Sequence, residues 1–455
     1  MPRERWRCSP LLDSPVGDSL LRRIATLALP ALGVLAAEPL YLLFDIAVVG
    51  RLGAVSLAGL AVGGLIVTLV STQLTFLSYG TTARSARFHG AGDRPAAVRE
   101  GVQATWLAVG LGVLVVIVVQ VAAVPLVSAI GGAGPIADAA IPWLRIAIFA
   151  APAILISLAG NGWMRGVQDT AGPLRYVLTG FCVSALLCPP LVYGWLGLPR
   201  WELAGSAVAN LIGQWFAALL FCRALAAEQV SLRPDPPALR AQLVMGRDLV
   251  VRTMAFQACF VSAAAVAARF GAAALAAHQV VLQLWSFLAL VLDSLAIAAQ
   301  SLVGSALGGG DPGQARRVAW RVTGISALAA AGLAAALAIG ATVIPALFTD
   351  DRAVLTAIGV PWWFLVAQLP FAGVLFALDG VLLGAGDAAF MRNATVISAL
   401  AGFLPLTWLS LKFGWGLTGI WAGLSVFIGL RLVFGLWRTL SGRWSVAGLR
   451  PPRST

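Results

Sequence analysis

The sequence predicts an all-α polytopic membrane protein with twelve transmembrane helices, arranged as two pseudo-symmetric six-helix bundles. Three observations lead to this fold class. Hydrophobic residues make up 60% of the 455 residues and charged residues only 11%, whereas about a quarter of the residues in soluble proteins are charged. Apolar runs of about 20 residues or more, long enough to cross a bilayer, recur along the whole chain. Short motifs in the first half return in the second half at one fixed spacing.

The apolar runs divide into two sets of six. The first six lie at about 24–49, 57–82, 101–130, 139–163, 174–196 and 202–226. The other six lie at about 249–269, 275–306, 319–348, 354–384, 390–413 and 416–438.

A polar, proline-rich stretch separates the two sets and contains Arg233-Pro234-Asp235-Pro236-Pro237. Such a stretch predicts a semi-rigid linker. The domain organisation we expect is a cytosolic tail over 1–20, an N-terminal bundle over 21–226, a cytosolic linker over 227–242, a C-terminal bundle over 243–440 and a cytosolic tail over 441–455.

The two halves repeat each other. Gly90-Ala91-Gly92-Asp93 recurs as Gly308-Gly309-Gly310-Asp311, and Gly166-Val167-Gln168-Asp169 recurs as Gly384-Ala385-Gly386-Asp387. The offset is the same for both motifs, since 311 − 93 and 387 − 169 both equal 218. These glycine-aspartate motifs lack a preceding strand and a lysine, so they predict tight turns between helices and not phosphate-binding loops. Six spans per half is an even number, so the repeats are parallel, and transporters built from parallel repeats bind substrate between the halves.

The basic residues indicate the orientation in the membrane. Of the 31 Lys and Arg residues, 25 fall on the side of the membrane that holds the termini, as expected for cytosolic segments under the positive-inside rule. We therefore expect a multi-pass protein of the cell (plasma or inner) membrane with both termini in the cytosol. The basic residues are not clustered as in a nucleic-acid-binding surface, so no nucleic-acid partner is expected. Nothing in the sequence requires a protein partner, and a monomer is expected.

The sequence lacks the motifs of several classes of pumps and enzymes. The sequence contains no GxxxxGK[ST], HExxH or GxSxG motif, so neither an ATP-driven pump nor a zinc or serine hydrolase is predicted. We expect a protein that is not an enzyme and that uses no cofactor and no structural metal.

Four carboxylates lie inside predicted spans, namely Glu38, Asp45, Asp293 and Asp379. A charged group at membrane depth costs at least about 2.5–3.5 kcal/mol and usually faces a cavity with a function. Glu38 and Asp45 are seven residues apart, almost two helical turns, so they share one face of the first helix at roughly 10 Å. The offset between the halves pairs Asp379 with Asn161. These five residues are the candidate coupling-ion and substrate-binding site, although each acid could instead belong to a structural ion pair or cap a helix.

The residues around Asp45 also resemble a known family. The run Asp45-Ile46-Ala47-Val48-Val49-Gly50-Arg51-Leu52-Gly53 is similar to the first-helix signature of the MATE (multidrug and toxic-compound extrusion) transporters. The repeated glycine-aspartate turns fit the same family, and Leu378-Asp379-Gly380-Val381-Leu382-Leu383-Gly384 is most similar to its DinF-like branch. The resemblance implies a V-shaped pair of six-helix bundles that export lipophilic, often cationic compounds in exchange for H⁺ or Na⁺. It also implies that Asp45 is the coupling residue.

The sequence departs from the family pattern at two places. Many relatives in this branch carry Asn and Asp four residues apart on the fifth helix, where this chain has Ser184 and Cys188. A glutamate of another branch has only Phe256 or Gln257 near its place. Na⁺ requires several oxygen ligands together, whereas a proton requires one acid, so the single acid Asp45 favours H⁺ as the coupling ion.

Alternatives to drug export remain at this point. A flippase for lipid-linked or anionic lipid substrates would need arginines in the central cavity. Only Arg145, Arg252 and Arg431 lie near spans, and we expect all three close to span ends. A membrane-bound enzyme or a structural subunit is opposed by the missing motifs and by the repeat. Trp285 lies deep in a span, where it could stack on a flat cation, although packing against lipid is the simpler expectation.

Overall fold

The computed structural model describes residues 16–448, and all the regular secondary structure in this range is helical. The outer parts of the two predicted tails, 1–15 and 449–455, lie outside the described residues. Within the described range, twelve segments are long and apolar enough to cross a membrane. The predicted fold class is therefore confirmed.

The first six spans contain eight α-helices. They are α1 (Val16–Val49), α2 (Ala54–Gln73), α3 (Phe76–Gly90), α4 (Arg94–Gly131), α5 (Pro135–Ala147), α6 (Ala151–Gly166), α7 (Ala171–Tyr193) and α8 (Glu202–Ala227). Helices α2 and α3 form one span, and α5 and α6 form another. Helix α1 continues through Pro30 and Pro39 without a break.

The last six spans contain seven α-helices. They are α9 (Pro236–Arg269), α10 (Ala272–Gly308), α11 (Pro312–Ile339), α12 (Arg352–Gly384), α13 (Ala388–Ser398), α14 (Leu404–Phe413) and α15 (Gly416–Leu440). A π-helical segment over residues 399–403 joins α13 to α14 within one span. The largest difference from the predicted spans is the start of α9, at Pro236 in place of residue 249.

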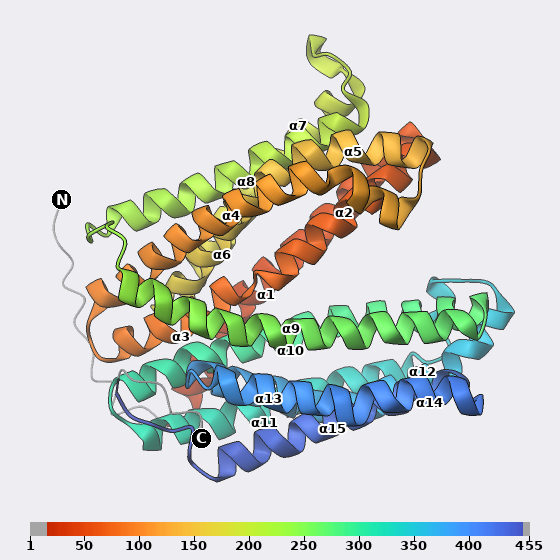
Figure 1. The fold of residues 1–455 in the computed structure, drawn as a ribbon. Helices are drawn as coiled ribbons and strands as arrows, with labels where there is room; N and C mark the ends of the chain where they lie inside the picture. The colour runs from red at the N-terminus through yellow and green to blue at the C-terminus, as the bar shows by residue number, and fades with distance from the viewer. Residues whose placement is uncertain (1–15, 449–455) are drawn as a thin grey trace.

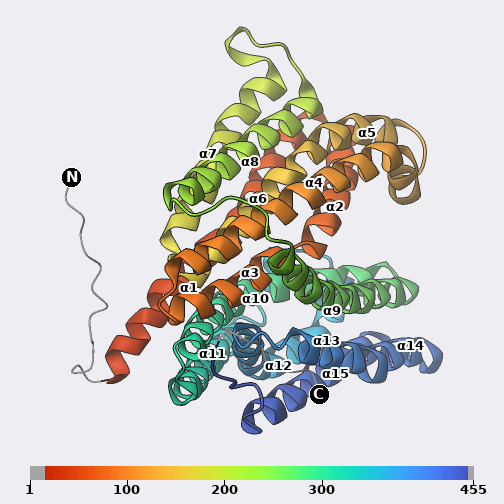
Figure 2. The same ribbon diagram turned by 60° about the vertical axis from the view of Figure 1, so that its left-hand side comes forward.

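The helices form two groups that lie side by side, α1–α8 in one and α9–α15 in the other (Figures 1 and 2). We call these the N-terminal and the C-terminal bundle. At the end of the molecule where α1 begins, α3 and α1 pack against α10 of the other bundle. At the opposite end, near α5 and α14, the two groups diverge (Figure 1).

The helix boundaries repeat at the offset found in the sequence. Helix α2 begins at Ala54 and α10 at Ala272, while α6 ends at Gly166 and α12 at Gly384. The differences 272 − 54 and 384 − 166 both equal 218. Asn161 on α6 and Asp379 on α12 each lie five residues before the end of their helix. The two residues therefore occupy equivalent helices, as the offset predicts.

The two bundles approach each other closely where α3 and α10 cross at two glycines. A Cβ atom at Gly90 would collide with the carbonyl oxygen of Ser305, and one at Gly308 would collide with the carbonyl oxygen of Arg87. The two collisions are related by the repeat, since 308 − 90 and 305 − 87 both equal 218. Small residues let helix backbones approach closely, and here they bring the bundles together near the internal symmetry axis.

The predicted turns after these helices are confirmed. The Asp93 carboxylate accepts a hydrogen bond from the Ala96 backbone N–H at 2.9 Å and caps α4. The Asp311 carboxylate does the same for α11, with the Gln314 N–H at 2.7 Å. Aspartate at an N-cap satisfies an otherwise unpaired backbone donor, so these residues end one helix pair and start the next.

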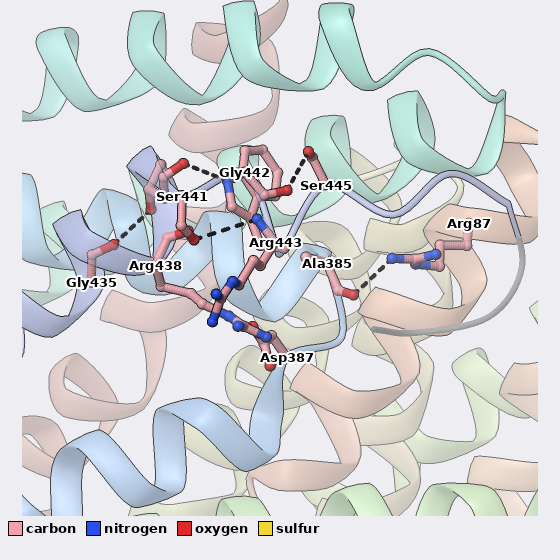
Figure 3. Close-up of polar contacts among 11 residues, drawn as sticks. Arg87, Ala385, Asp387, Gly435, Arg438, Ser441, Gly442, Arg443 and Ser445 are labelled. Atoms are coloured by element: carbon pink, nitrogen blue, oxygen red, sulfur yellow. Dashed lines mark hydrogen bonds and ion pairs between the residues drawn. The ribbon is translucent and has the colours of Figure 1, made fainter. Parts of the chain in front are cut away.

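Polar contacts also fasten the end of the molecule where α1 begins (Figure 3). The Arg87 guanidinium on α3 donates to the carbonyl oxygen of Ala385, in the turn after α12, at 2.7 Å, and to that of Gly448 at 2.6 Å. In the same turn, the buried Asp387 carboxylate accepts a hydrogen bond from Arg438 Nε at 2.7 Å. Burial raises the pKa of Asp387, and Arg438 opposes that rise. These contacts tie α3, the α12–α13 turn and the chain after α15 into one closed end.

Candidate functional site

Asp45 is buried on α1 among neutral hydrogen-bond donors. The Ser206 hydroxyl on α8 lies 2.7 Å from one carboxylate oxygen and 2.9 Å from the other. The Cys188 thiol on α7 lies 3.4 Å from the first oxygen. The Asp45 side chain has no ion pair within the described residues, and its exposed fraction is 3%. The site is therefore a lone acid held by a hydroxyl and a thiol.

The two residues that depart from the family pattern both face α1. Cys188 contacts Asp45, and one turn earlier the Ser184 hydroxyl donates to the Tyr41 hydroxyl at 2.6 Å. These two positions of the fifth span therefore face the first helix, as the resemblance implies. Their side chains are an uncharged hydroxyl and an uncharged thiol, in place of the Asn and Asp of many relatives. Ser206 was not predicted, because nothing in the sequence distinguishes it from the other serines in spans.

Glu38 and Asn161 line a cavity of about 200 Å³ inside the N-terminal bundle. Helices α1, α3, α6, α7 and α8 form its walls. The Glu38 side chain is exposed and has no hydrogen bond or ion pair to the described residues, so it faces the cavity. The Asn161 side-chain oxygen is buried and lacks a hydrogen-bond partner. We call this space the N-terminal cavity.

Arg165 also lines the N-terminal cavity, although its position after the predicted fourth span suggested a cytosolic loop. It is buried near the end of α6 and donates to the Ser78 hydroxyl at 3.3 Å. A guanidinium and a carboxylate thus border the same space, which gives this cavity a mixed polar lining.

Asp293 and Asp379 line a second cavity, of about 360 Å³, which lies mainly within the C-terminal bundle and is closed on one side by Thr72, Thr75 and Tyr79 of the N-terminal bundle. The Asp379 Oδ2 atom accepts hydrogen bonds from Arg252, at 2.6 Å, and from Arg431. The Asp293 side chain has no hydrogen bond or ion pair within the described residues. We call this space the C-terminal cavity. Asp379 is therefore neutralised by two arginines and is not a free site for a cation.

The expectation that Arg252 and Arg431 lie near span ends is wrong. Helix α9 begins at Pro236, so Arg252 lies several turns inside it, and Arg431 lies well inside α15. Both line the C-terminal cavity. The expectation for Trp285 is also wrong, because its buried side chain lines this cavity in place of the lipid-facing surface.

The five predicted site residues fall into three places. Glu38 and Asn161 share the N-terminal cavity, Asp293 and Asp379 share the C-terminal cavity, and Asp45 borders neither. The two cavities are neighbours, because Thr75 and Tyr79 line both. The Tyr79 backbone carbonyl also accepts a hydrogen bond from Gln300 of α10 at 2.7 Å, which joins the bundles at this wall.

Comparison with known proteins gives matches over nearly the whole chain. A family model described as MatE matches twice, over residues 30–189 and 249–409. The chain is 33% identical over 446 residues to "Protein DETOXIFICATION 44, chloroplastic" of Arabidopsis thaliana, which covers 94% of this chain and 84% of that protein. It is 31% identical over 443 residues to "DNA damage-inducible protein F" of Escherichia coli, covering 92% and 93%.

A third relative is a "Probable multidrug resistance protein NorM" of Deinococcus radiodurans, 28% identical over 443 residues, with 93% and 96% covered. Among solved structures, "MATE in the bent conformation" superposes with a TM-score of 0.84 at 21% identity and covers 94% of this chain and 95% of that one. The "outward-facing conformation of a multidrug resistance MATE family transporter" gives 0.82 at 20% identity, covering 93% and 97%. At 20–21% identity, the similarity to these two structures shows a shared fold only.

Proposed function

Because the chain belongs to the MatE family, we propose that it is a proton-coupled antiporter that exports lipophilic and cationic compounds by alternating access. Members of this family are transporters and not enzymes. The two family matches, one in each half, agree with the internal repeat and with the twelve spans. The flippase alternative gains no support from the relatives reported above, and we do not propose it.

The observation that carries the proposal is the environment of Asp45. Its carboxylate is almost fully buried, touches only neutral donors and has no counter-cation in the described chain. Burial without a counter-ion disfavours the charged form of a carboxylate, and a proton is the simplest way to remove the charge. A Na⁺ site would need several oxygen ligands placed together. Around Asp45 the partners are one hydroxyl and one thiol, and a thiol is a poor ligand for a hard cation.

Coupling then follows from two conformations with different access to Asp45. In the structure Asp45 is occluded and borders neither cavity, so this state holds the protonated acid. When the bundles rearrange and open the other end, water or cationic cargo reaches α1 and favours the ionised form. Each ligand binds one state better and shifts the equilibrium toward it. Proton entry and cargo exit thereby alternate.

Cargo binds in the N-terminal cavity, beside Glu38. This residue lies on the same helix as Asp45, and its carboxylate faces the cavity without a partner in the described chain. An unpaired carboxylate beside an apolar wall attracts a lipophilic cation. Glu38 therefore contributes to cargo affinity, whereas Asp45 controls the exchange with protons.

The proposed location is the cell membrane, with both termini in the cytosol. The excess of basic residues on the side of the termini supports this orientation. With the closed end in the cytosol, the state described here has its bundles parted on the outer side (Figure 1).

The test is transport in inverted membrane vesicles. An acidic vesicle interior should drive uptake of a fluorescent lipophilic cation without sodium, and Asp45→Asn should abolish that uptake. Asp138→Asn is the matched control, because Asp138 is an exposed acid on α5, outside both cavities, and the variant should transport normally. Uptake that requires a sodium gradient and ignores pH contradicts the choice of ion. Uptake that survives in the Asp45→Asn variant contradicts the choice of residue.

A further inference from the structure

Two guanidinium groups in the C-terminal cavity converge on a single oxygen atom. Arg252 of α9 and Arg431 of α15 each donate through Nη2 to Oδ2 of Asp379 on α12. Within the described chain these are the hydrogen bonds that the two side chains make. The other carboxylate oxygen, Oδ1, accepts none from either arginine.

This arrangement leaves most of the guanidinium donors unused. Each guanidinium carries five N–H donors, and a guanidinium usually binds a carboxylate through two parallel N–H···O bonds. Here neither arginine forms such a pair with Asp379. The Arg252 Nε atom is buried and has no hydrogen-bond partner at all. A purely structural ion triad would be expected to satisfy these donors, because unpaired buried polar groups are costly.

Aromatic rings surround the two arginines. The Phe256 ring lies 5.3 Å from the Arg252 guanidinium carbon and 4.7 Å from that of Arg431. Phe427 lies 5.4 Å from Arg431. Trp285 packs edge-on against Phe376, with ring centroids 6.3 Å apart, and both rings line the cavity. The cavity therefore combines two guanidinium groups that have free donors with flat apolar walls.

Two arginines and two aspartates line this cavity, so their formal charges balance, but only one of the aspartates is bonded to the guanidinium groups. Asp379 offsets one of the two arginines, while the Asp293 carboxylate lines the same space and contacts neither guanidinium within hydrogen-bond distance. The exposed fraction of the side chain is 6% for Arg431 and 15% for Arg252, so bulk water screens both charges poorly. An added anion that reached both guanidinium groups would fill the free donors that Asp379 and Asp293 leave without a hydrogen bond.

We propose that the C-terminal cavity is a binding site for small aromatic carboxylates. The carboxylate of the ligand binds the free N–H groups of Arg252 and Arg431, and its ring lies against Phe256, Phe427 and Trp285. A cavity of about 360 Å³ is at the small end of the range for ligand pockets, which suits one compact aromatic molecule. This site lies apart from Asp45 and takes cargo of the opposite charge, so it stands or falls independently of the proposed proton coupling.

The experiment compares three naphthalene probes whose side groups differ in charge. These are 2-naphthoate, its uncharged methyl ester and the cation 2-naphthylmethylammonium. Binding is measured by isothermal titration calorimetry on the full-length protein in phosphatidylcholine nanodiscs, so that the lipid adds no net charge. The variants are Arg431→Gln and Asp379→Asn, and Arg99→Gln is the control, because it removes an exposed arginine on α4.

We expect 2-naphthoate to bind the wild type at least about tenfold more tightly than either of the other probes. Arg431→Gln should weaken naphthoate binding at least about tenfold, since one of the two cationic partners is lost. Asp379→Asn should tighten it several-fold, because the competing carboxylate is gone and both guanidinium groups become available. Arg99→Gln should bind as the wild type does.

The Asp379→Asn result separates a ligand site from a structural triad. In a triad that serves packing alone, the wild type binds none of the probes, and loss of the central acid mainly lowers stability because it leaves two uncompensated buried cations. Naphthoate binding that is unchanged or weakened by Asp379→Asn would overturn the proposal. Equal binding of naphthoate and its methyl ester to the wild type would also overturn it. If Arg431→Gln does not fold, Arg431→Lys keeps the charge but loses the planar fork and should weaken naphthoate binding to a smaller degree.

Discussion

The partners of Asp45 explain both what sequence reading finds at this site and what it misses. A carboxylate inside an apolar run stands out, and so do the two fifth-span residues that depart from the family pattern. Ser206 does not stand out, because it is 161 residues away from Asp45 and is one of several serines in spans. Which side of α8 meets α1 is decided by packing between helices, and this information is not local.

Ser206 provides a test of how Asp45 is held. Ser206→Ala removes the only hydroxyl that donates to Asp45 in the described chain. The ionised form of Asp45, which the proposed cycle also requires, then loses a hydrogen bond of the kind that contributes about 1.5–3 kcal/mol. We expect proton-driven uptake to fall roughly tenfold, with the protein still folded, as measured by initial rates in inverted vesicles.

The control for this change is Ser184→Ala. Its hydroxyl donates to Tyr41, one helical turn away from Asp45, so this variant also removes a buried hydroxyl that bonds to α1, in this case from α7. Uptake should fall much less in this variant. Equal losses in the two variants would show that Ser206 only helps the helices to pack.

At the scale of helices, local signals predict most boundaries. The turns at Asp93 and Asp311 follow from N-capping and from the glycine that precedes each aspartate, with φ of +81° at Gly92 and +80° at Gly310. Helix α9 is the exception. Its first turns are rich in polar residues, so a search for apolar runs starts it at residue 249, whereas Pro236 is well suited to a first helical position. Because the expected span begins at residue 249, it places Arg252 at a span end, whereas the helix begins at Pro236.

The glycine crossing of α3 and α10 leads to a prediction about conformation. In Gly308→Ala, the added methyl group would collide with the Arg87 carbonyl oxygen, which is backbone and cannot rotate away. The closed end should therefore open, and the parted ends near α5 and α14 should approach each other. Spin labels at Ala133, between α4 and α5, and at Ala346, between α11 and α12, are measured by double electron–electron resonance and should show a shift to shorter distances.

Gly110→Ala is the matched control for this experiment. Gly110 lies inside α4, and nothing is within 4 Å of the position its Cβ would take. In the Gly110→Ala variant, the distribution of distances between the two spin labels should equal that of the wild type. A Gly308→Ala distribution that also equals the wild type would show that the crossing yields to a methyl group and does not hold this state.

At the scale of the whole molecule, the repeat makes the architecture predictable. A single offset between the halves describes the sequence motifs, the helix boundaries and the glycine crossing. The halves differ in their polar residues, and here the expectation that Arg252 and Arg431 lie near span ends failed. The sequence places acids in both halves, but only side-chain packing reveals that Asp45 is alone while Asp379 is held between two arginines.

The orientation in the membrane can be tested at Ala133, in the loop between α4 and α5. This loop lies at the end opposite the termini, so a cysteine placed there should react with a membrane-impermeant maleimide added to intact cells. A cysteine in place of Ala91, in the turn before α4, should react only after the membrane is made permeable. The reverse pattern would invert the proposed topology.

The chain beyond α15 has a practical consequence for protein engineering. Residues 446–448 supply two of the backbone carbonyl groups to which Arg87 donates, and the Gly448 N–H donates in turn to the Leu307 carbonyl of α10 at 3.0 Å. A purification tag that replaces this segment, or a shortened variant that ends at α15, therefore removes part of the fastening between the bundles. We expect such a change to favour opening of this end, so variants with and without this segment should not be treated as interchangeable in assays.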